Sequence, residues 1–197
     1  MKVSSISAAA LAVLVSASLG CSADQIASPS DRTLSPGVPA FGAVDENQSS
    51  TYTWHVNNTV TEASNGDRVR LTGTGPLGLH PKSASGGGTF THTDAEGNVL
   101  GSGTWSVTEL LSFQSYGPSP LFPTTFNGVG GKAELRVQLT KLTPGTTIVY
   151  EGIMDVECRL PGLQVPGGTV EGVNLVVPGV ANFNKPVSGT TLFRKIS

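Results

Sequence analysis

The stretch GGGTFTHTDAEGNVLGSGTWSVTELLSF, residues 86–113, predicts two long β-strands joined by a tight turn, and the later parts of the chain repeat its pattern. On both sides of residues 94–98, small or polar side chains alternate with large or apolar ones, as in a strand with one buried face. Gly97 and Asn98 suit the turn, because both residue types tolerate the positive φ angles of tight hairpin connections. This stretch therefore predicts a hairpin that serves as scaffold.

A second hairpin, residues 132–160, shows the clearest alternation in the sequence, with a turn at residues 143–145. A slip of one residue in strand pairing would expose every apolar side chain on its inner face, so the register is firmly set. Gly152, in the middle of the second strand, predicts a bend or a bulge. The residues predicted to face inward are Ala133, Leu135, Val137, Leu139, Ile148, Tyr150, Met154, Val156, Cys158 and Leu160.

Further strands are predicted on both sides of the two hairpins, and the segments between them are rich in proline and glycine. An aromatic inner face is expected early in the chain, where Tyr52, Trp54 and Val56 alternate with polar residues. The other predicted strands are residues 67–74, 170–177, 180–184 and 188–196, and the predicted loops are residues 75–85, 114–131 and 161–168.

These elements predict an all-β fold for residues 50–197, a single domain of seven to nine antiparallel strands. A meander closed into a small β-barrel is favoured, because closure removes exposed strand edges; a β-sandwich is the alternative. The predicted barrel is similar in architecture to the calycin and allene-oxide-cyclase barrels. No motif of either family is present, so this likeness concerns architecture alone.

The start of the chain has the features of an export signal. Lys2 precedes a short apolar run at residues 6–19, which is shorter than the roughly 20 residues that a membrane-spanning helix needs. Leu19, Gly20 and Cys21 resemble the end of the lipobox of bacterial lipoproteins, although Ser18 stands where that motif usually has leucine. The resemblance implies cleavage after residue 20 and lipidation of Cys21; ordinary signal cleavage near Ala17 or Ala23 is the alternative.

Residues 21–49 are rich in Ser, Pro, Asp and Ala without apolar periodicity, and we expect a disordered tether between lipid and domain. The expected location is the bacterial cell envelope, with a membrane anchor through the N-terminal lipid. Ser22, in place of aspartate, implies the outer membrane if the bacterium has two membranes. A secreted or periplasmic protein is the alternative.

Composition and motifs exclude several function classes. The 12 basic and 14 acidic residues show no strong clustering, so no nucleic-acid partner is expected. Residues 73–78 match G-x-G-x-x-G, but no helix follows to face a phosphate, and no cofactor is predicted. No metal site is predicted either, because His55, His80 and His92 are isolated from one another.

Two ionisable residues of the first hairpin interrupt its apolar phases, and they are the candidate catalytic residues. His92 shares a face with Phe90, and Glu109 shares one with Trp105, Val107, Leu111 and Phe113. Either both point into the barrel interior, or a bulge near Glu109 returns its carboxylate to water. Cys158 is expected to be a small buried apolar residue, because it lies on the inner phase of its strand.

The candidate ligand contacts are Tyr116, Phe122 and Phe126, in the aromatic-rich segment of residues 114–131. The sequence predicts an envelope domain that binds a small apolar ligand or a partner protein. One alternative is an isomerase or hydrolase that uses His92 and Glu109. The other alternative is a purely structural envelope protein.

Overall fold

The computed structural model describes residues 50–143, 146–165 and 167–196. The predicted signal peptide, the lipidation site Cys21 and the tether lie outside the described residues. Among the described residues, no helix is both long enough and apolar enough to cross a membrane.

The described residues form nine β-strands and one 3-10 helix. The strands are β1 (Thr51–Ala63), β2 (Arg68–Leu79), β3 (Lys82–Ala84), β4 (Gly87–Thr93), β5 (Val99–Pro118), β6 (Gly128–Thr143), β7 (Thr146–Cys158), β8 (Gly172–Val177) and β9 (Ala181–Lys195). The 3-10 helix, η1 (Thr124–Phe126), lies between β5 and β6. The prediction of an all-β domain is confirmed.

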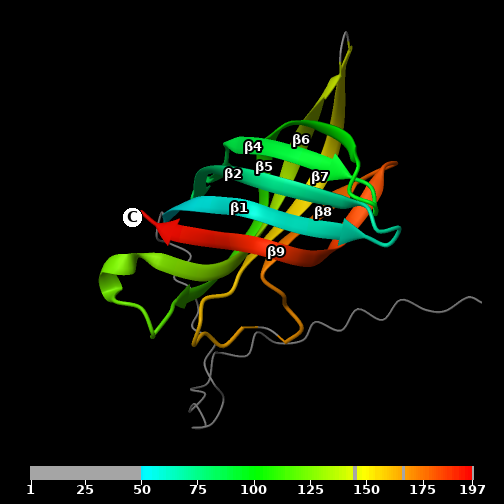
Figure 1. The fold of residues 1–197 in the computed structure, drawn as a ribbon. Coiled ribbons are helices and arrows are strands. Elements are labelled where there is room, and N and C mark those ends of the chain that lie inside the picture. The colour runs from blue at the N-terminus through cyan, green and yellow to red at the C-terminus, as the bar shows by residue number, and fades with distance from the viewer. Residues whose placement is uncertain (1–49, 144–145, 166, 197) are drawn as a thin grey trace, which may run out of the picture. The chain divides into compact units, whose positions relative to one another are not determined.

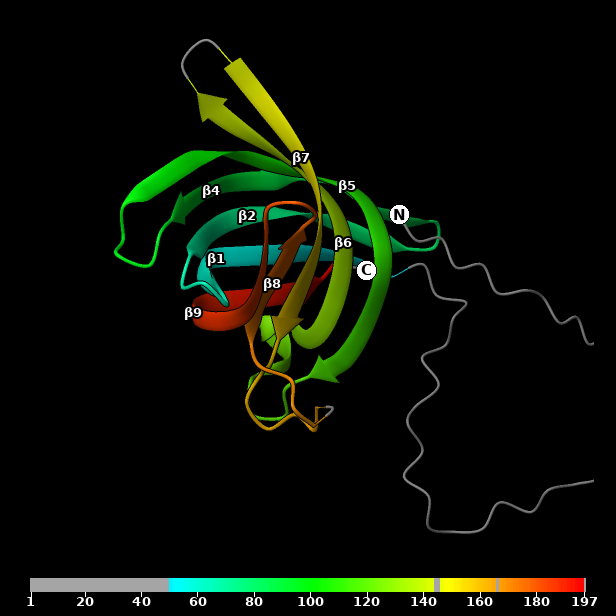
Figure 2. The same ribbon diagram turned by 90° about the vertical axis from the view of Figure 1, so that its right-hand side faces the viewer.

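The strands belong to one antiparallel sheet in the order β1-β9-β8-β7-β6-β5-β4-β2-β3. Because β1 also pairs with β2, the pairing returns to its first strand and forms a ring (Figure 1). The ring is uneven, since β9 also pairs directly with β6 at Gly128 and Val129, beyond the ends of β7 and β8. The β6–β7 hairpin projects beyond the other strands, as Figure 2 shows.

The hairpin of residues 86–113 is present as β4 and the first part of β5, with the turn at residues 94–98. Phe90, Trp105 and Val107 are buried, as predicted. The pairing of β5 with β6 then shifts between Val107 and Glu109 and again between Leu110 and Ser112. These bulges change the phase of the strand, so Leu110 is buried in place of Leu111.

Two segments predicted as loops contain more strand than expected, and two segments predicted as separate strands are continuous. Strand β2 continues to Leu79 and β3 follows, so the predicted loop of residues 75–85 was wrong. The loop between β5 and β6 is confined to residues 119–127, because both strands extend into the segment predicted as loop. The predicted strands of residues 180–184 and 188–196 together form the single strand β9. Backbone pairing with neighbouring strands overrides the proline and glycine signals that suggested loops.

Large aromatic side chains fill the ring near the start of β1. Trp54 and Trp105 lie 5.4 Å apart by ring centroids, and Phe113 lies 4.9 Å from Tyr52 and 5.0 Å from Phe193. Glycines give the indoles room: a Cβ at Gly73 would be 2.5 Å from Trp105, and one at Gly75 would be 2.8 Å from Trp54. Both indole N–H groups donate to backbone carbonyls, those of Ser85 and Thr72, so neither is left unpaired.

Candidate functional site

A pocket of about 370 Å³ lies inside the ring at the end opposite the loop of residues 119–127. We call it the His92 pocket. Its walls come from β2 and from β4 to β9, so the ring itself, rather than one loop, forms the cavity. The lining residues are Val69, Phe90, His92, Leu100, Gly101, Leu139, Lys141, Tyr150, Leu175, Val177, Val180 and Phe183.

His92 extends from β4 into this pocket and is held on two sides. Its Nε2 lies 3.3 Å from Oδ2 of Asp67, and its ring meets the Phe183 ring edge to face at 5.4 Å. The side chains of His92 and Asp67 are only 21% and 19% exposed. The structure therefore supports the prediction that His92 faces the interior, and it adds a carboxylate partner that the sequence did not indicate.

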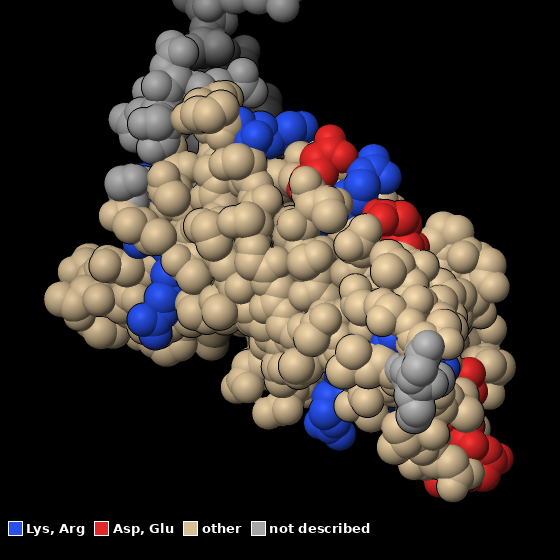
Figure 3. Space-filling view, turned by 90° about the horizontal axis from the view of Figure 1, so that it is seen from above, with Lys and Arg blue, Asp and Glu red and all other residues tan. Residues whose placement is uncertain are grey.

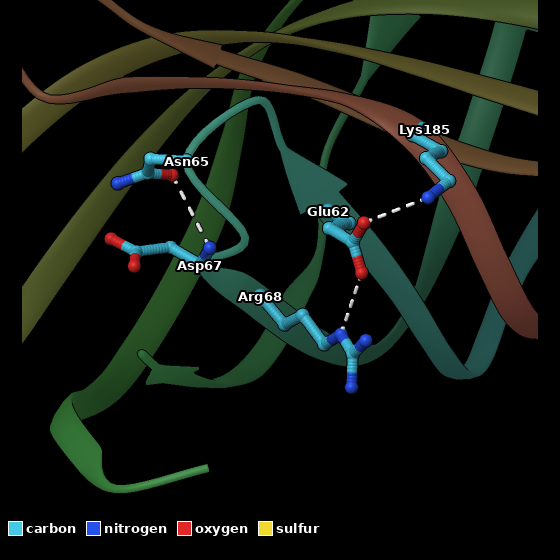
Figure 4. Close-up of polar contacts among 5 residues, drawn as sticks. All are labelled: Glu62, Asn65, Asp67, Arg68 and Lys185. Carbon is cyan, nitrogen blue, oxygen red and sulfur yellow. Dashed lines mark hydrogen bonds and ion pairs between the residues drawn. The ribbon is translucent and has the colours of Figure 1, made fainter. Parts of the chain in front are cut away.

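The β1–β2 turn positions Asp67, as Figure 4 shows. The backbone N–H of Asp67 donates to the Asn65 side chain at 3.2 Å, which fixes the turn. Glu62, on β1, accepts from Arg68 and Lys185, each at 2.8 Å, and so joins this turn to β9. The Asp67 carboxylate points away from that charged cluster, so it is left to pair with His92.

Lys141 and Tyr150 also line the His92 pocket, and neither was predicted as a site residue. The signal for Lys141 was present in the sequence, because the inward phase of Ala133 to Leu139 leads to residue 141 in steps of two. Tyr150 was predicted to face inward, but as a core residue. Asp67 had no such signal, because its position depends on pairing between β2 and β4.

The structure does not bring Glu109 to His92. The bulge after Val107 turns Glu109 outward, where its side chain is 53% exposed and its Oε2 accepts from Arg136 at 2.9 Å. Glu109 is not a lining residue of the His92 pocket. Of the two interpretations that the sequence left open, the structure shows the bulge, which removes Glu109 from the interior.

The three aromatic residues predicted as ligand contacts separate into two groups. The rings of Phe122 and Phe126 lie 4.8 Å apart by centroids in the 119–127 loop, tilted by 49°. Together with Lys195, both line a second hollow of about 660 Å³. That hollow is formed almost wholly by the loop and its flanks, and Phe122 is 39% exposed.

Tyr116 instead points to β7, where its hydroxyl donates to Oε1 of Glu157 at 2.8 Å. Glu157 is 6% exposed, and burial raises the pKa of its carboxyl above the ordinary value. Burial and the contact with Glu157 likewise raise the pKa of Tyr116. This pair is a structural contact at the end of the ring that the aromatic core fills, and no sequence pattern indicated it.

Metal and thiol chemistry find little support in the described residues. They contain no group of three or more His, Cys, Asp or Glu side chains that could hold a metal ion. Cys158 is fully buried, and burial raises the pKa of its thiol to about 12, so it packs as a small apolar residue.

In the face shown in Figure 3, acidic and basic side chains are interspersed and much of the surface is uncharged.

Comparison of the chain with protein-family models, with curated proteins and with solved structures finds no match.

Proposed function

We propose that the domain binds a small, largely apolar molecule in the His92 pocket. The observation that carries this proposal is a cavity of about 370 Å³ whose walls are mainly aliphatic and aromatic side chains from neighbouring strands. Ligand pockets are commonly about 300–1,000 Å³, mostly apolar, with a few polar groups that orient the ligand. His92, Lys141 and Tyr150 are polar groups of that kind.

The ring of strands supports a finer proposal for the fold, a small barrel with calycin-like architecture, with a sandwich as the alternative. Strand β1 pairs with β2 on one side and β9 on the other, as barrel closure requires. A barrel also gives the ligand an interior bounded by strands on all sides. Amide exchange offers a test: because both edges of β1 are paired, its N–H groups should be protected along the whole strand.

We also propose that the binding domain is held at the bacterial cell envelope by a lipid on Cys21. Support comes from the apolar run, the lipobox-like residues 19–21 and the tether-like composition of residues 21–49. In a bacterial host, the Cys21→Ser variant should leave the membrane fraction. Retention of that variant in the membrane would contradict anchoring through Cys21.

The binding proposal is tested with N-phenyl-1-naphthylamine, a neutral apolar dye that fluoresces when it leaves water. Val177 is 5% exposed and lines the pocket, whereas its neighbour Val176 is 40% exposed and does not. The Val177→Phe variant should bind the dye at least about tenfold more weakly, because a ring occupies the site. The matched Val176→Phe variant should bind like the unmodified protein. Absence of saturable binding, or equal binding by all three proteins, would overturn the proposal.

A second candidate function is proton transfer on the bound molecule, favoured by the contact between His92 and Asp67. A carboxylate that orients a histidine produces a general base. The pocket lining contains no Ser, Thr or Cys, so an isomerase-type reaction suits it better than hydrolysis through a covalent intermediate. Glu109 has no part in this version, because it lies on the outer surface.

Deuterium exchange tests the catalytic candidate. An apolar ketone such as phenylacetone, incubated with the protein in D₂O, should exchange its α-hydrogens faster than with the His92→Asn variant. Equal exchange with both proteins would rule out His92 as a general base for this class of substrate.

The sequence also left open two other functions, binding of a partner protein and a purely structural role. A partner-protein function finds support in exposed apolar side chains of the projecting hairpin, Leu142, Ile148 and Val149. A purely structural function calls for an interior filled by side chains. The His92 pocket is the reason that we prefer ligand binding to both.

A further inference from the structure

The polar groups of the His92 pocket lie together on neighbouring strands. His92 on β4 pairs with Gly101 on β5, and Lys141 on β6 pairs with Gly103, two residues further along β5. Tyr150 on β7 pairs with Leu139, two residues before Lys141. Since all of these side chains line the same pocket, His92, Lys141 and Tyr150 form a polar arc across β4 to β7.

The other side of the pocket is apolar. It is lined from β8, the β8–β9 turn and β9 by Leu175, Val177, Val180 and Phe183. Leu175, Val177 and Phe183 are buried, whereas Val180, at the turn, is 49% exposed. A bound molecule therefore meets hydrocarbon on one side and hydrogen-bonding groups on the other.

Gly101 explains how Lys141 comes to lie in the pocket. A Cβ at Gly101 would be 2.5 Å from Cε of Lys141 and 3.0 Å from its Nζ. The lysine side chain therefore lies directly on the glycine backbone, in space that any other residue type would occupy. Lys141 is thus one of the lining residues, and it is only partly exposed.

The charge of Lys141 has no counterpart within the described part of the chain. None of the ion pairs found there involves Lys141. His92, on the same arc, already shares its Nε2 with Asp67. An ammonium beside an apolar cavity gains most from an anionic partner, because charge-assisted hydrogen bonds are stronger where water is partly excluded.

We propose that the His92 pocket selects amphiphilic anions, molecules with an apolar body and one carboxylate or sulfonate head. The body fills the space between Phe90 and Phe183, the head contacts the Lys141 ammonium, and the Tyr150 hydroxyl donates a further hydrogen bond. This inference rests on the proposed function and adds the chemical class of the ligand.

Two dyes with the same carbon skeleton test the inference. N-phenyl-1-naphthylamine is neutral, and 1-anilinonaphthalene-8-sulfonate adds a sulfonate. The Lys141→Gln variant should weaken binding of the sulfonate dye about three- to tenfold and leave binding of the neutral dye unchanged. Lys141→Arg, which keeps the charge, should retain most of the affinity for the sulfonate dye.

The control is Lys195→Gln, which removes an exposed lysine from the hollow at the opposite end of the ring. It should leave the affinity for both dyes unchanged. Gly101→Ala gives an independent test, because the added methyl displaces the Lys141 side chain while its charge remains. That variant should weaken the sulfonate dye selectively, as Lys141→Gln does, but by a smaller factor.

Competition extends the test from dyes to aliphatic molecules. Decanoate should displace the neutral dye at lower concentration than decanol, and Lys141→Gln should remove that difference.

The outcomes separate the two proposals. If neither dye binds saturably, the proposed function falls, and this inference falls with it. If the neutral dye binds in the pocket but Lys141→Gln weakens both dyes equally, only the inference is overturned. Selective loss of the sulfonate dye in Lys195→Gln instead would place the anion site in the opposite hollow and would also overturn it.

Discussion

The two ends of the ring follow the same rule of inward and outward alternation, yet the interior is filled by aromatic rings at one end and is hollow at the other. At the filled end the inward residues are large rings: Trp54 packs against Trp105, and Phe113 packs against Phe193. At the hollow end, Val69, Leu139 and the other lining side chains leave about 370 Å³ unfilled. The alternation of inward and outward residues therefore does not by itself determine where the cavity lies.

Ionisable side chains also differ between the two ends. At the filled end, Glu157 is buried under Tyr116, which donates a hydrogen bond to it. At the hollow end, His92 and Lys141 line a space that a ligand can occupy, and the Asp67 carboxylate lies 3.3 Å from His92. The first arrangement holds the fold together, whereas the second leaves polar groups available for binding.

The largest expected difference between the ends comes from truncation of a core side chain. Trp54 is fully buried among other rings, so Trp54→Ala should lower the free energy of unfolding by about 3–5 kcal/mol. Leu139→Ala should cost only about 2 kcal/mol, because Leu139 already faces the cavity on one side. Urea unfolding measures both values, followed by the fluorescence of Trp105 alone in Trp54→Ala and of both tryptophans in Leu139→Ala. Equal costs at both sites would mean that the hollow end is as closely packed as the filled one.

Enlarging a side chain should have opposite consequences at the two ends. Val137 is fully buried and lies outside the pocket lining, so Val137→Phe should cost about 1–3 kcal/mol through overpacking. Val177→Phe should leave stability unchanged or raise it by up to about 1 kcal/mol, because the ring enters existing space. Thermal unfolding of the two variants decides the matter. A comparable loss in Val177→Phe would contradict the presence of a real cavity.

The hydroxyl of Tyr116 should matter more than that of Tyr150. Tyr116→Phe leaves the buried Glu157 carboxylate without its donor, at a cost of about 1–2 kcal/mol near neutral pH. Tyr150→Phe should change stability by less than about 0.5 kcal/mol, since its hydroxyl has no hydrogen-bond partner among the described residues.

The pH dependence gives this comparison a second readout. Burial raises the pKa of Glu157 in the folded state, so the folded protein holds that proton more tightly than the unfolded chain. The contribution of Glu157 to stability therefore falls as the pH rises from the unfolded pKa of about 4.3 through the raised folded pKa. Loss of the Tyr116 donor steepens this fall, so Tyr116→Phe should be more damaging at pH 7.5 than at pH 4.5. If the loss of stability in Tyr116→Phe did not depend on pH, the effect of Tyr116 would not depend on the charge of Glu157.

Much of the fold could be predicted from the sequence, because alternation reports which face of a strand is buried. It correctly predicted the inner face of the second hairpin from Ala133 to Leu139 and from Met154 to Cys158, but it was wrong for Ile148, which is 37% exposed. Alternation fails where pairing inserts an extra residue, and the bulge after Val107 in β5 moved both Glu109 and Leu110. The volume of the cavity could not be predicted from the alternation within any one strand, because it depends on side chains from β2 and from β4 to β9.

The candidate site shows the same limit. His92 could be selected because a polar residue interrupted an apolar phase within one hairpin. Its partner Asp67 comes from another hairpin, and the contact exists only because β2 pairs with β4 at Val69 and His92. Lys141 lay on a predictable inward phase, but its importance depends on the missing side chain of Gly101 on the adjacent strand.

The smallest expected effect concerns the contact between His92 and Asp67. A partly exposed ion pair contributes about 0–1 kcal/mol, and Asn keeps an oxygen that can accept from His92, so Asp67→Asn should lower stability by less than about 1 kcal/mol. The affinity for N-phenyl-1-naphthylamine should change by less than about twofold, because the apolar walls stay intact. Urea unfolding and dye titration of the same preparation measure the two quantities. A loss of about 2 kcal/mol or more would show that His92 and Asp67 stabilise the hollow end as Tyr116 and Glu157 stabilise the filled end. The contrast between binding groups and structural groups would then no longer hold.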